Sequence, residues 1–305
     1  MAFTAQDVKK LREMTNCGMM DCKKALTETD GDMDKAVEFL REKGLATAAK
    51  KAGRIASEGM VEATVFDCCG VGVAVEVNSE TDFVAKNADF QKFVGDIAEV
   101  IAKQNPADVE ALKDLKINDS QTVGEALTEK IATIGENMNI RRFVRYEGIN
   151  QAYIHAGGRI GVLVNFEVAD PAKAEEEAFK TMAKDVAMQI AAVAPQYVCE
   201  AEVPAEVVEK EKEILKAQAL NEGKPEAIVE KMIVGRIKKF FKDICLVDQA
   251  FVKDGDISVG TYIANVAKEL GTEIKVVKFA RLEKGEGLEK KEENFADEVA
   301  KMMGN

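Results

Sequence analysis

The stretch Val71-Gly-Val-Ala-Val-Glu-Val77, with the segment Asn78-Ser-Glu-Thr-Asp-Phe-Val-Ala-Lys86 that follows it, is the best guide to the fold of this chain. The first part is apolar and rich in valine, which is typical of a buried β-strand. The second part is polar and leads into a helical pattern that opens near Ala88. A strand, a connection and a helix therefore form the unit from which the rest of the chain can be interpreted.

This unit occurs twice in the sequence. Residues 58–106 align without a gap to residues 147–195, an offset of 89 positions, with 13 identities in 49 pairs. Gly72 of the first copy aligns with Gly161 of the second. Each copy has apolar strands around a glycine turn, followed by an amphipathic helix. We therefore expect two related α+β subdomains that share one core.

The whole chain is expected to be an α+β protein built from five parts. These are a three-helix module resembling a ubiquitin-associated fold at 1–54, a first core subdomain at 55–146, a second core subdomain at 147–202 and 244–282, an inserted coiled-coil hairpin at 203–243, and a C-terminal helical module at 283–305.

Helix signals in the first module are local. Thr4 begins a capping-box pattern, and Asp32 is placed to cap the third helix. We expect that third helix to span 33–43 and to end at Gly44, because glycine commonly closes helices. A basic, alanine-rich tether is expected over 46–54.

Three further segments lie outside the repeated unit. Residues 104–130 are expected to form a surface excursion with one short helix at 107–115. Two arms of about 17 residues, 204–220 and 226–242, predict an αα-hairpin that interrupts the second core copy. An amphipathic helix is expected at 288–303.

Composition limits the class of protein. The 305 residues are 47% hydrophobic, but charges interrupt every apolar stretch before the roughly 18 residues that a membrane span needs. A net charge of −12 argues against general nucleic-acid binding, although Lys50-Lys51, Arg141-Arg142 and Lys238-Lys239 are candidate basic patches. The first residues lack the pattern of a secretory signal, and six cysteines without a CxxC pair indicate reduced thiols in a cytoplasm.

Catalytic and metal-binding motifs are missing from the sequence. It contains no phosphate loop, no nucleophile elbow and no HExxH pattern, and its one histidine, His155, has no motif partner. We expect no enzyme activity, no cofactor and no metal site. His155 precedes the turn Ala156-Gly-Gly158, where it either completes that turn or contacts a partner.

Asp82 and Phe83 form the strongest candidate site. A carboxylate beside a large aromatic ring is unusual on a connection, and such connections often carry binding residues. Two interpretations are open: Phe83 packs back as a core cap while Asp82 starts the helix, or both face a partner. The second repeat copy has Pro171 and Ala172 at these positions, which favours a role outside the shared fold.

Three motifs are spaced along the chain: Gly18-Met-Met-Asp-Cys-Lys-Lys-Ala-Leu26, Thr81-Asp-Phe-Val84 with the following Ala-Lys, and Gly135-Glu-Asn-Met-Asn-Ile-Arg-Arg142. Together they resemble the bacterial elongation factor Ts family. The resemblance covers nearly the whole chain. It implies an exchange factor that binds elongation factor Tu in its GDP-bound and nucleotide-free forms and releases GDP. Neither nucleic acid nor membrane is an expected partner.

The resemblance also implies roles for particular residues. Phe83 would insert beside the nucleotide pocket of the partner and perturb its magnesium site, with Asp82 in support, within the segment Thr81, Asp82, Phe83 and Val84. The remaining implied contacts are Arg12, Met19, Met20, Lys23, Ile134 and His155.

Two other functions compete with this one. The N-terminal module, with Met19 and Met20 on a turn, could act as a ubiquitin-associated adaptor without exchange activity. The hairpin at 203–243 could make the chain a structural oligomer, and a homodimer through it is compatible with exchange. Departures from the family pattern are mild: Asn87 and Met138 replace residues that are common in it.

Overall fold

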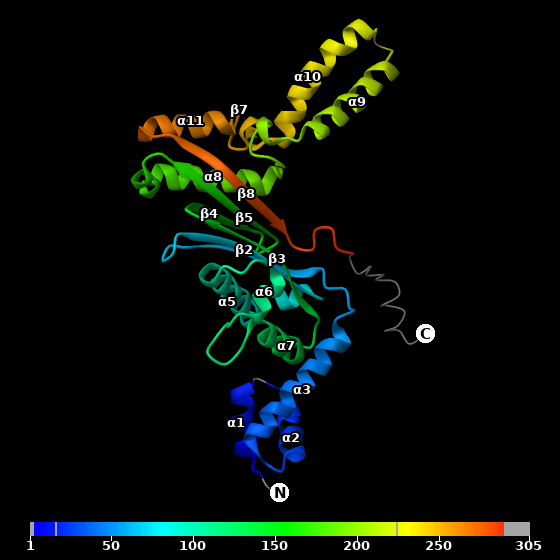
Figure 1. Cartoon of the computed structure of the whole chain (residues 1–305), viewed down its shortest axis with the longest axis vertical. Coiled ribbons are helices and arrows are strands. Elements are labelled where there is room, and N and C mark those ends of the chain that lie inside the picture. The colour runs from blue at the N-terminus through cyan, green and yellow to red at the C-terminus, as the bar shows by residue number, and fades with distance from the viewer. Residues whose placement is uncertain (1–2, 16, 224, 290–305) are drawn as a thin grey trace.

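The computed structural model describes residues 3–15, 17–223 and 225–289 (Figure 1). It is a mixed α+β protein with small antiparallel sheets, as the sequence predicted. The helices in chain order are α1 (Ala5–Thr15), α2 (Met19–Glu28), α3 (Met33–Lys51), α4 (Asp82–Ala85), α5 (Ala88–Gln104), α6 (Val109–Asp114), α7 (Val123–Ile134), α8 (Glu177–Val193), α9 (Ala205–Asn221), α10 (Glu226–Ile244) and α11 (Val259–Leu270). The strands are β1 (Glu58–Phe66), β2 (Val71–Ser79), β3 (Met138–Glu147), β4 (Ile149–His155), β5 (Ile160–Val168), β6 (Ala250–Phe251), β7 (Asp254–Ser258) and β8 (Ile274–Glu283). Short 3-10 turns occupy η1 (Pro171–Glu175), η2 (Glu200–Glu202) and η3 (Leu246–Asp248).

Two three-stranded antiparallel sheets make up the centre of the molecule. One has the order β1-β2-β3 and the other β4-β5-β8. Their inner faces pack against each other through a small apolar cluster that includes Val61, Ala74 and Leu163. Because β2 and β5 are covered on both faces, they consist of nearly continuous apolar residues rather than alternating ones.

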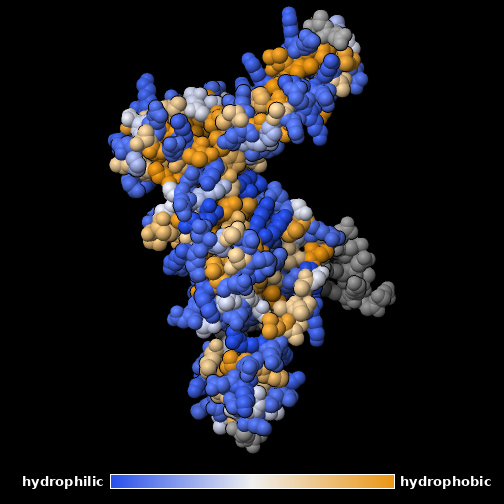
Figure 2. Space-filling view, in the orientation of Figure 1, coloured by the Kyte–Doolittle hydropathy of each residue, from blue (hydrophilic) through white to orange (hydrophobic). Residues whose placement is uncertain are grey.

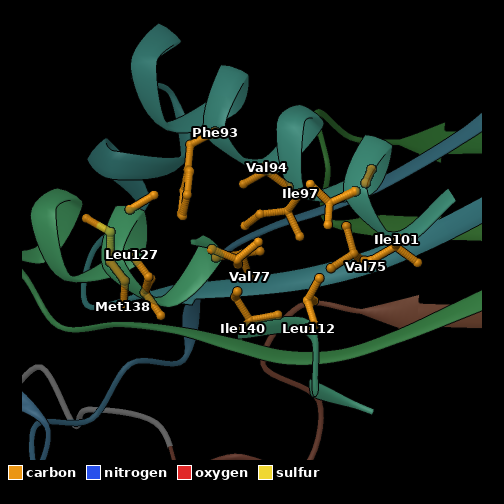
Figure 3. Packing of buried hydrophobic residues seen from close by; sticks show 14 of the residues in the cluster. Val75, Val77, Phe93, Val94, Ile97, Ile101, Leu112, Leu127, Met138 and Ile140 are labelled. Carbon is orange, nitrogen blue, oxygen red and sulfur yellow. The ribbon is translucent and has the colours of Figure 1, made fainter. Parts of the chain in front are cut away.

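Helices cover the outer face of each sheet. On the first sheet, side chains from α5, α6 and α7 meet the valines of β2, as Figure 3 shows for Val75, Val77 and Ile97. On the second sheet, α8 and α11 cover β5. The result is a helix–sheet–sheet–helix arrangement in which each sheet has its own outer core.

Within the repeated unit, the elements of the two sheets match at the offset of 89, whereas the third strands, β3 and β8, lie outside that unit. Strand β2 corresponds to β5 and helix α5 to α8, and in both pairs the first residues and the last residues are 89 positions apart. The register irregularity at Glu76/Val77 in β2 recurs at Asn165/Phe166 in β5. The alignment found in the sequence therefore coincides with equivalent places in the structure.

The third helix is longer than predicted. Helix α3 continues through Gly44 to Lys51, so the expected end at Gly44 and the expected tether at 46–54 were wrong. The alanine-rich continuation has high helix propensity, and α3 packs on α7. Gly44 lies inside this helix and faces α7, where a Cβ atom would make an ordinary contact with that of Ala132 at 3.6 Å.

The expected surface excursion at 104–130 was also wrong in part. The short helix α6 is present, but α7 follows it and belongs to the core. Thr122 and Glu125 form a full capping box before it, and Leu127 and Ile131 are buried against the first sheet.

The hairpin was predicted correctly. Helices α9 and α10 form its arms and extend away from the sheets (Figure 1). No helix of the described residues is long and apolar enough to cross a membrane. Leu288 and Glu289 are not helical, and the rest of the predicted C-terminal helix lies outside the described residues.

Candidate partner-binding surface

The turn after β2 presents Phe83 to solvent. Asp82 begins the four-residue helix α4, as one interpretation of the sequence required. Phe83 is 77% exposed, whereas the next residue, Val84, is 5% exposed and packs into the core of the first sheet. Of the two interpretations of the sequence, the one in which Phe83 packs back as a core cap is therefore wrong.

The backbone before Phe83 is fixed by Glu136. The Thr81 amide donates a hydrogen bond to one carboxylate oxygen of Glu136 at 2.9 Å, and Thr81 Oγ1 donates to the other at 2.6 Å. Glu80 in turn accepts from the Asn137 amide at 2.6 Å. Since Val84 is buried on the other side, the exposed ring stands on a segment that is fixed at both ends.

Lys86 completes this surface. Its Nζ lies 2.7 Å from Asp82 Oδ2 and 5.7 Å from the centre of the Phe83 ring. The hydrogen bond from Lys86 lowers the pKa of Asp82, and the charges of Lys86 and Lys284 add to this effect. Asp82 therefore presents a carboxylate next to the ring at neutral pH.

A buried carboxylate organises the same end of the sheets. Glu76 accepts from Arg141 at 3.0 Å, from Arg142 at 2.6 Å and from the Gly285 amide at 2.8 Å. Burial would raise the pKa of Glu76, but these bonds and one from Asn78 outweigh it and hold the pKa below its ordinary value. Arg141 and Arg142 are thus partly buried ion-pair partners, and they do not form an open basic patch.

Ile134 and His155 lie near this end of the sheets. Ile134 ends α7, packs partly against the first core and precedes Glu136 by two residues. His155 ends β4 and is exposed, with Nδ1 3.3 Å from the Tyr153 hydroxyl. The turn that follows it contacts β1, where the Gly158 carbonyl accepts from the Val61 amide, and α4 also contacts β1.

The other implied contact residues lie on the N-terminal helices. Arg12 is exposed on α1 and Lys23 on α2. Met19 and Met20 are 54% and 74% exposed at the start of α2. The tertiary structure does not bring these four residues to the Phe83 turn, because α1 and α2 form a separate bundle at one end of the molecule (Figure 1).

The chemistry of this surface is that of binding. In the described part of the chain, no three or more histidine, cysteine or acidic side chains form a group that could hold a metal ion. What the surface offers is an exposed ring, a carboxylate and an ammonium group on a fixed backbone.

Sequence reasoning missed Glu76 and Glu136. Glu136 lies within the third motif, but its partner Thr81 is 55 positions away, so no local spacing joins them. Glu76 was interpreted only as one residue of an apolar strand, without a role of its own. A single charge within a buried strand was the one available signal, because buried carboxylates require partners.

Comparison with known proteins gives a consistent result. A family model described as "Elongation factor TS" matches residues 80–286. The chain is 58% identical over 307 residues to elongation factor Ts of Clostridium perfringens, covering 99% of each chain. It is 54% identical over 305 residues to elongation factor Ts of Clostridium botulinum strain Eklund 17B, again covering 99% of each.

Proposed function

This chain belongs to the elongation factor Ts family and shares its nucleotide-exchange role in translation elongation, and we propose that it releases GDP from elongation factor Tu through the Phe83 turn. In this proposal the chain binds both the GDP-bound and the nucleotide-free form of elongation factor Tu. The adaptor alternative is not favoured, because the similarity extends over nearly the full chain.

Exchange follows from thermodynamic linkage. A factor that binds the nucleotide-free GTPase more tightly than the GDP form weakens GDP binding by the same ratio. The factor needs no catalytic group, only contacts that the GDP-bound partner cannot make as well.

The single observation that carries the proposal is the exposed Phe83 on a fixed turn. Leaving a phenyl ring in water forgoes about 1.5–3 kcal/mol that burial in a partner would supply. Because Thr81 is held by Glu136 and Val84 by the core, the ring loses little conformational freedom on binding. The Phe83 ring would insert beside the nucleotide pocket of the partner, and Asp82 would contact the groups that it displaces. This would disturb the magnesium site and lower the affinity of the partner for GDP.

The remaining contacts hold the factor in place in this proposal. Met19 and Met20 supply exposed, adaptable apolar side chains. Arg12 and Lys23 add charge, and His155 adds an exposed imidazole from the second sheet. Ile134 is partly buried, packs against the first core and would meet the partner with the part of its side chain that stays accessible.

Organisation and cellular context complete the proposal. We place a ubiquitin-associated-like module at 1–54, duplicated core subdomains at 55–146 and at 147–202 with 244–282, and a hairpin at 203–243 that joins two copies of the chain. The matched elements at an offset of 89 support the duplication. The protein is proposed to act in the cytoplasm, without a cofactor and without contacting nucleic acid.

Release of a fluorescent GDP analogue from elongation factor Tu tests the function and its mechanism together. The wild-type chain should accelerate release strongly in excess unlabelled GDP. Phe83→Ala should lower the maximal rate constant about tenfold to 100-fold, the equivalent of the burial energy of one ring. The affinity of the variant for elongation factor Tu, measured by titration, should fall by a smaller factor than the rate constant of GDP release.

Val277→Ala is the matched control, since it truncates another exposed apolar residue that lies on β8. It should leave the release rate unchanged. Strong acceleration that survives Phe83→Ala would refute the insertion mechanism while leaving the exchange role intact. No acceleration by the wild-type chain would refute the exchange role in this pairing.

A further inference from the structure

Two adjacent cysteines occupy the turn between β1 and β2. Cys68 and Cys69 are both exposed, and their sulfur atoms lie 3.9 Å apart. Cys69 Sγ also lies 3.6 Å from the Phe66 carbonyl oxygen, which holds it beside the turn backbone. The other four cysteines are half-buried or buried, so this turn is the place in the described chain where two open thiols meet.

The spacing of these sulfurs suits a bridging atom. Two thiolate bonds of about 2.3 Å that meet at the pyramidal angles of a trivalent centre hold their sulfurs about 3.5 Å apart. The observed 3.9 Å therefore lets one soft atom bridge the pair after the two sulfurs approach by a few tenths of an ångström. Thiolates are soft ligands and select soft, thiophilic centres.

A disulfide between the same residues fits less well. Its sulfurs would have to approach to about 2.05 Å, and disulfide-bonded residues usually have Cα atoms at least about 4.4 Å apart. Neighbouring residues are only about 3.8 Å apart across a trans peptide. Geometry thus favours a bridged dithiol over an oxidised pair.

We propose that Cys68 and Cys69 form a bidentate site for soft, thiophilic centres that two thiolates satisfy, of the class of trivalent organic arsenicals. No third ligand completes a metal cage within the described residues. An arsenical brings its own organic group as the third substituent, so the pair supplies the whole remaining coordination.

The binding step balances without an oxidant. Two As–S bonds form as two As–O bonds of the hydrated arsenical break, and the two thiol protons leave with those oxygens as water. Local desolvation by the turn, with the neighbouring Cys68, raises the pKa of the exposed Cys69 thiol. The site therefore depends on the proximity of two thiols rather than on one acidic thiol.

The site is remote from the exchange surface. It precedes the start of β2 at Val71, whereas the Phe83 turn follows the end of β2 at Ser79. Nine strand residues separate these ends by about 27 Å at about 3.4 Å per residue. Occupancy should leave GDP release unchanged, which makes the two activities separable.

Phenylarsine oxide is the probe for the test. The full-length chain, reduced with a phosphine, is incubated with one equivalent and analysed by intact mass before and after a monothiol challenge. One phenylarsenic group per chain should persist in excess monothiol and be removed by a dithiol. Peptide mapping should place it on the β1–β2 turn.

Single-thiol variants decide the outcome. Cys68→Ser and Cys69→Ser should each lose the group at roughly 100-fold lower monothiol concentration, since the second, intramolecular bond is gone. Cys17→Ser is the control, because it removes a thiol that has another cysteine, Cys22, close to it in the sequence. This variant should retain the phenylarsenic group like the wild type. Retention by both turn variants, loss in Cys17→Ser, or no monothiol-resistant adduct on the wild-type chain would each overturn the proposal. Unchanged GDP release by the turn variants would verify that they are folded.

Discussion

Glu136 determines how the ring of Phe83 is presented. Its carboxylate is the acceptor for both donors of Thr81, two residues before the ring. Without it, the turn must be ordered when the partner binds, and ordering a loop or side chain costs about 0.5–1.5 kcal/mol.

Glu136→Ala should therefore reduce the GDP-release rate about twofold to tenfold, while Phe83 itself stays intact. The measurement is the same fluorescence assay, with thermal unfolding to show that the fold is retained. Glu99→Ala, which removes a glutamate from a surface pair with Lys103, is the control and should change neither quantity. An unaltered rate in Glu136→Ala would mean that the core contact of Val84 alone fixes the turn.

Glu76 is the residue on which stability at this end of the sheets depends. Its side chain is fully buried and pairs with two arginines. Glu76→Gln should lower the free energy of unfolding by about 3–5 kcal/mol, because two guanidinium groups lose their buried countercharge. Urea denaturation at pH 7 measures this loss.

The same carboxylate predicts a pH dependence. Because the folded-state pKa of Glu76 is depressed, its contribution is complete above the unfolded pKa of about 4.3 and is lost as pH falls through the lower folded value. The stability gap between the wild type and Glu76→Gln should therefore be constant from pH 7 to pH 5 and narrow below about pH 4. A gap that stays constant down to pH 3 would contradict a depressed pKa of Glu76 in the folded protein.

Among the secondary-structure elements, the close approach of the two sheets depends on glycine. Gly72 on β2 and Gly161 on β5 are equivalent residues of the repeat, and both face the opposite sheet. A Cβ atom at Gly161 would lie 2.4 Å from Val61 Cγ1, and one at Gly72 would lie 2.5 Å from Leu163 Cδ1. The repeated glycine therefore reflects sheet packing.

Gly161→Ala should destabilise the protein by about 1–3 kcal/mol through overpacking. Combining it with Val61→Ala should recover part of that loss, giving a coupling energy of about 1 kcal/mol in a double-mutant cycle. Gly95→Ala is the control, and it should raise the free energy of unfolding instead of lowering it. A Cβ atom added at this position of α5 would have no neighbour within 4 Å, so the higher helix propensity of alanine should stabilise the variant by about 0.5–1 kcal/mol. Strict additivity of the first two variants would show that the sheets separate to accept the methyl group.

Across the whole molecule, the hairpin is the most extended element. Its base packs on the body through Val203, Ile244 and Cys245 with side chains of both arms. Beyond the base, apolar side chains remain exposed, as Figure 2 shows along the arms. They include Ile214, Leu220, Ile228 and Val234. A second copy of the hairpin would cover them.

Replacing residues 212–237 by a short Gly-Ser linker, which keeps the base, should convert the proposed dimer into a monomer. Light scattering at micromolar concentration gives the mass of each form. Leu220→Ser with Val234→Ser tests the apolar contact without shortening the arms and should weaken the dimer in the same direction. A wild-type chain that is monomeric under these conditions would exclude the hairpin as a dimer contact.

The amino-acid sequence alone was enough to establish the mixed α+β class, the repeated unit and the hairpin, because each is encoded locally by periodicity, caps and glycine turns. It also singled out Phe83 as a candidate contact, from the family resemblance and from the alanine, Ala172, at the equivalent position of the repeat, and its role in binding stays a prediction. It failed where distant segments determine the result. Gly44 was predicted to end a helix, because the sequence does not show that α7 packs beside it. The residues of α7 were predicted to belong to a surface excursion, because the strands that bury them are distant in the sequence. The partners of Glu76 and Glu136 are likewise far away in sequence. These features became evident only in three dimensions, because close packing and buried charge pairing act between residues that one-dimensional spacing does not relate.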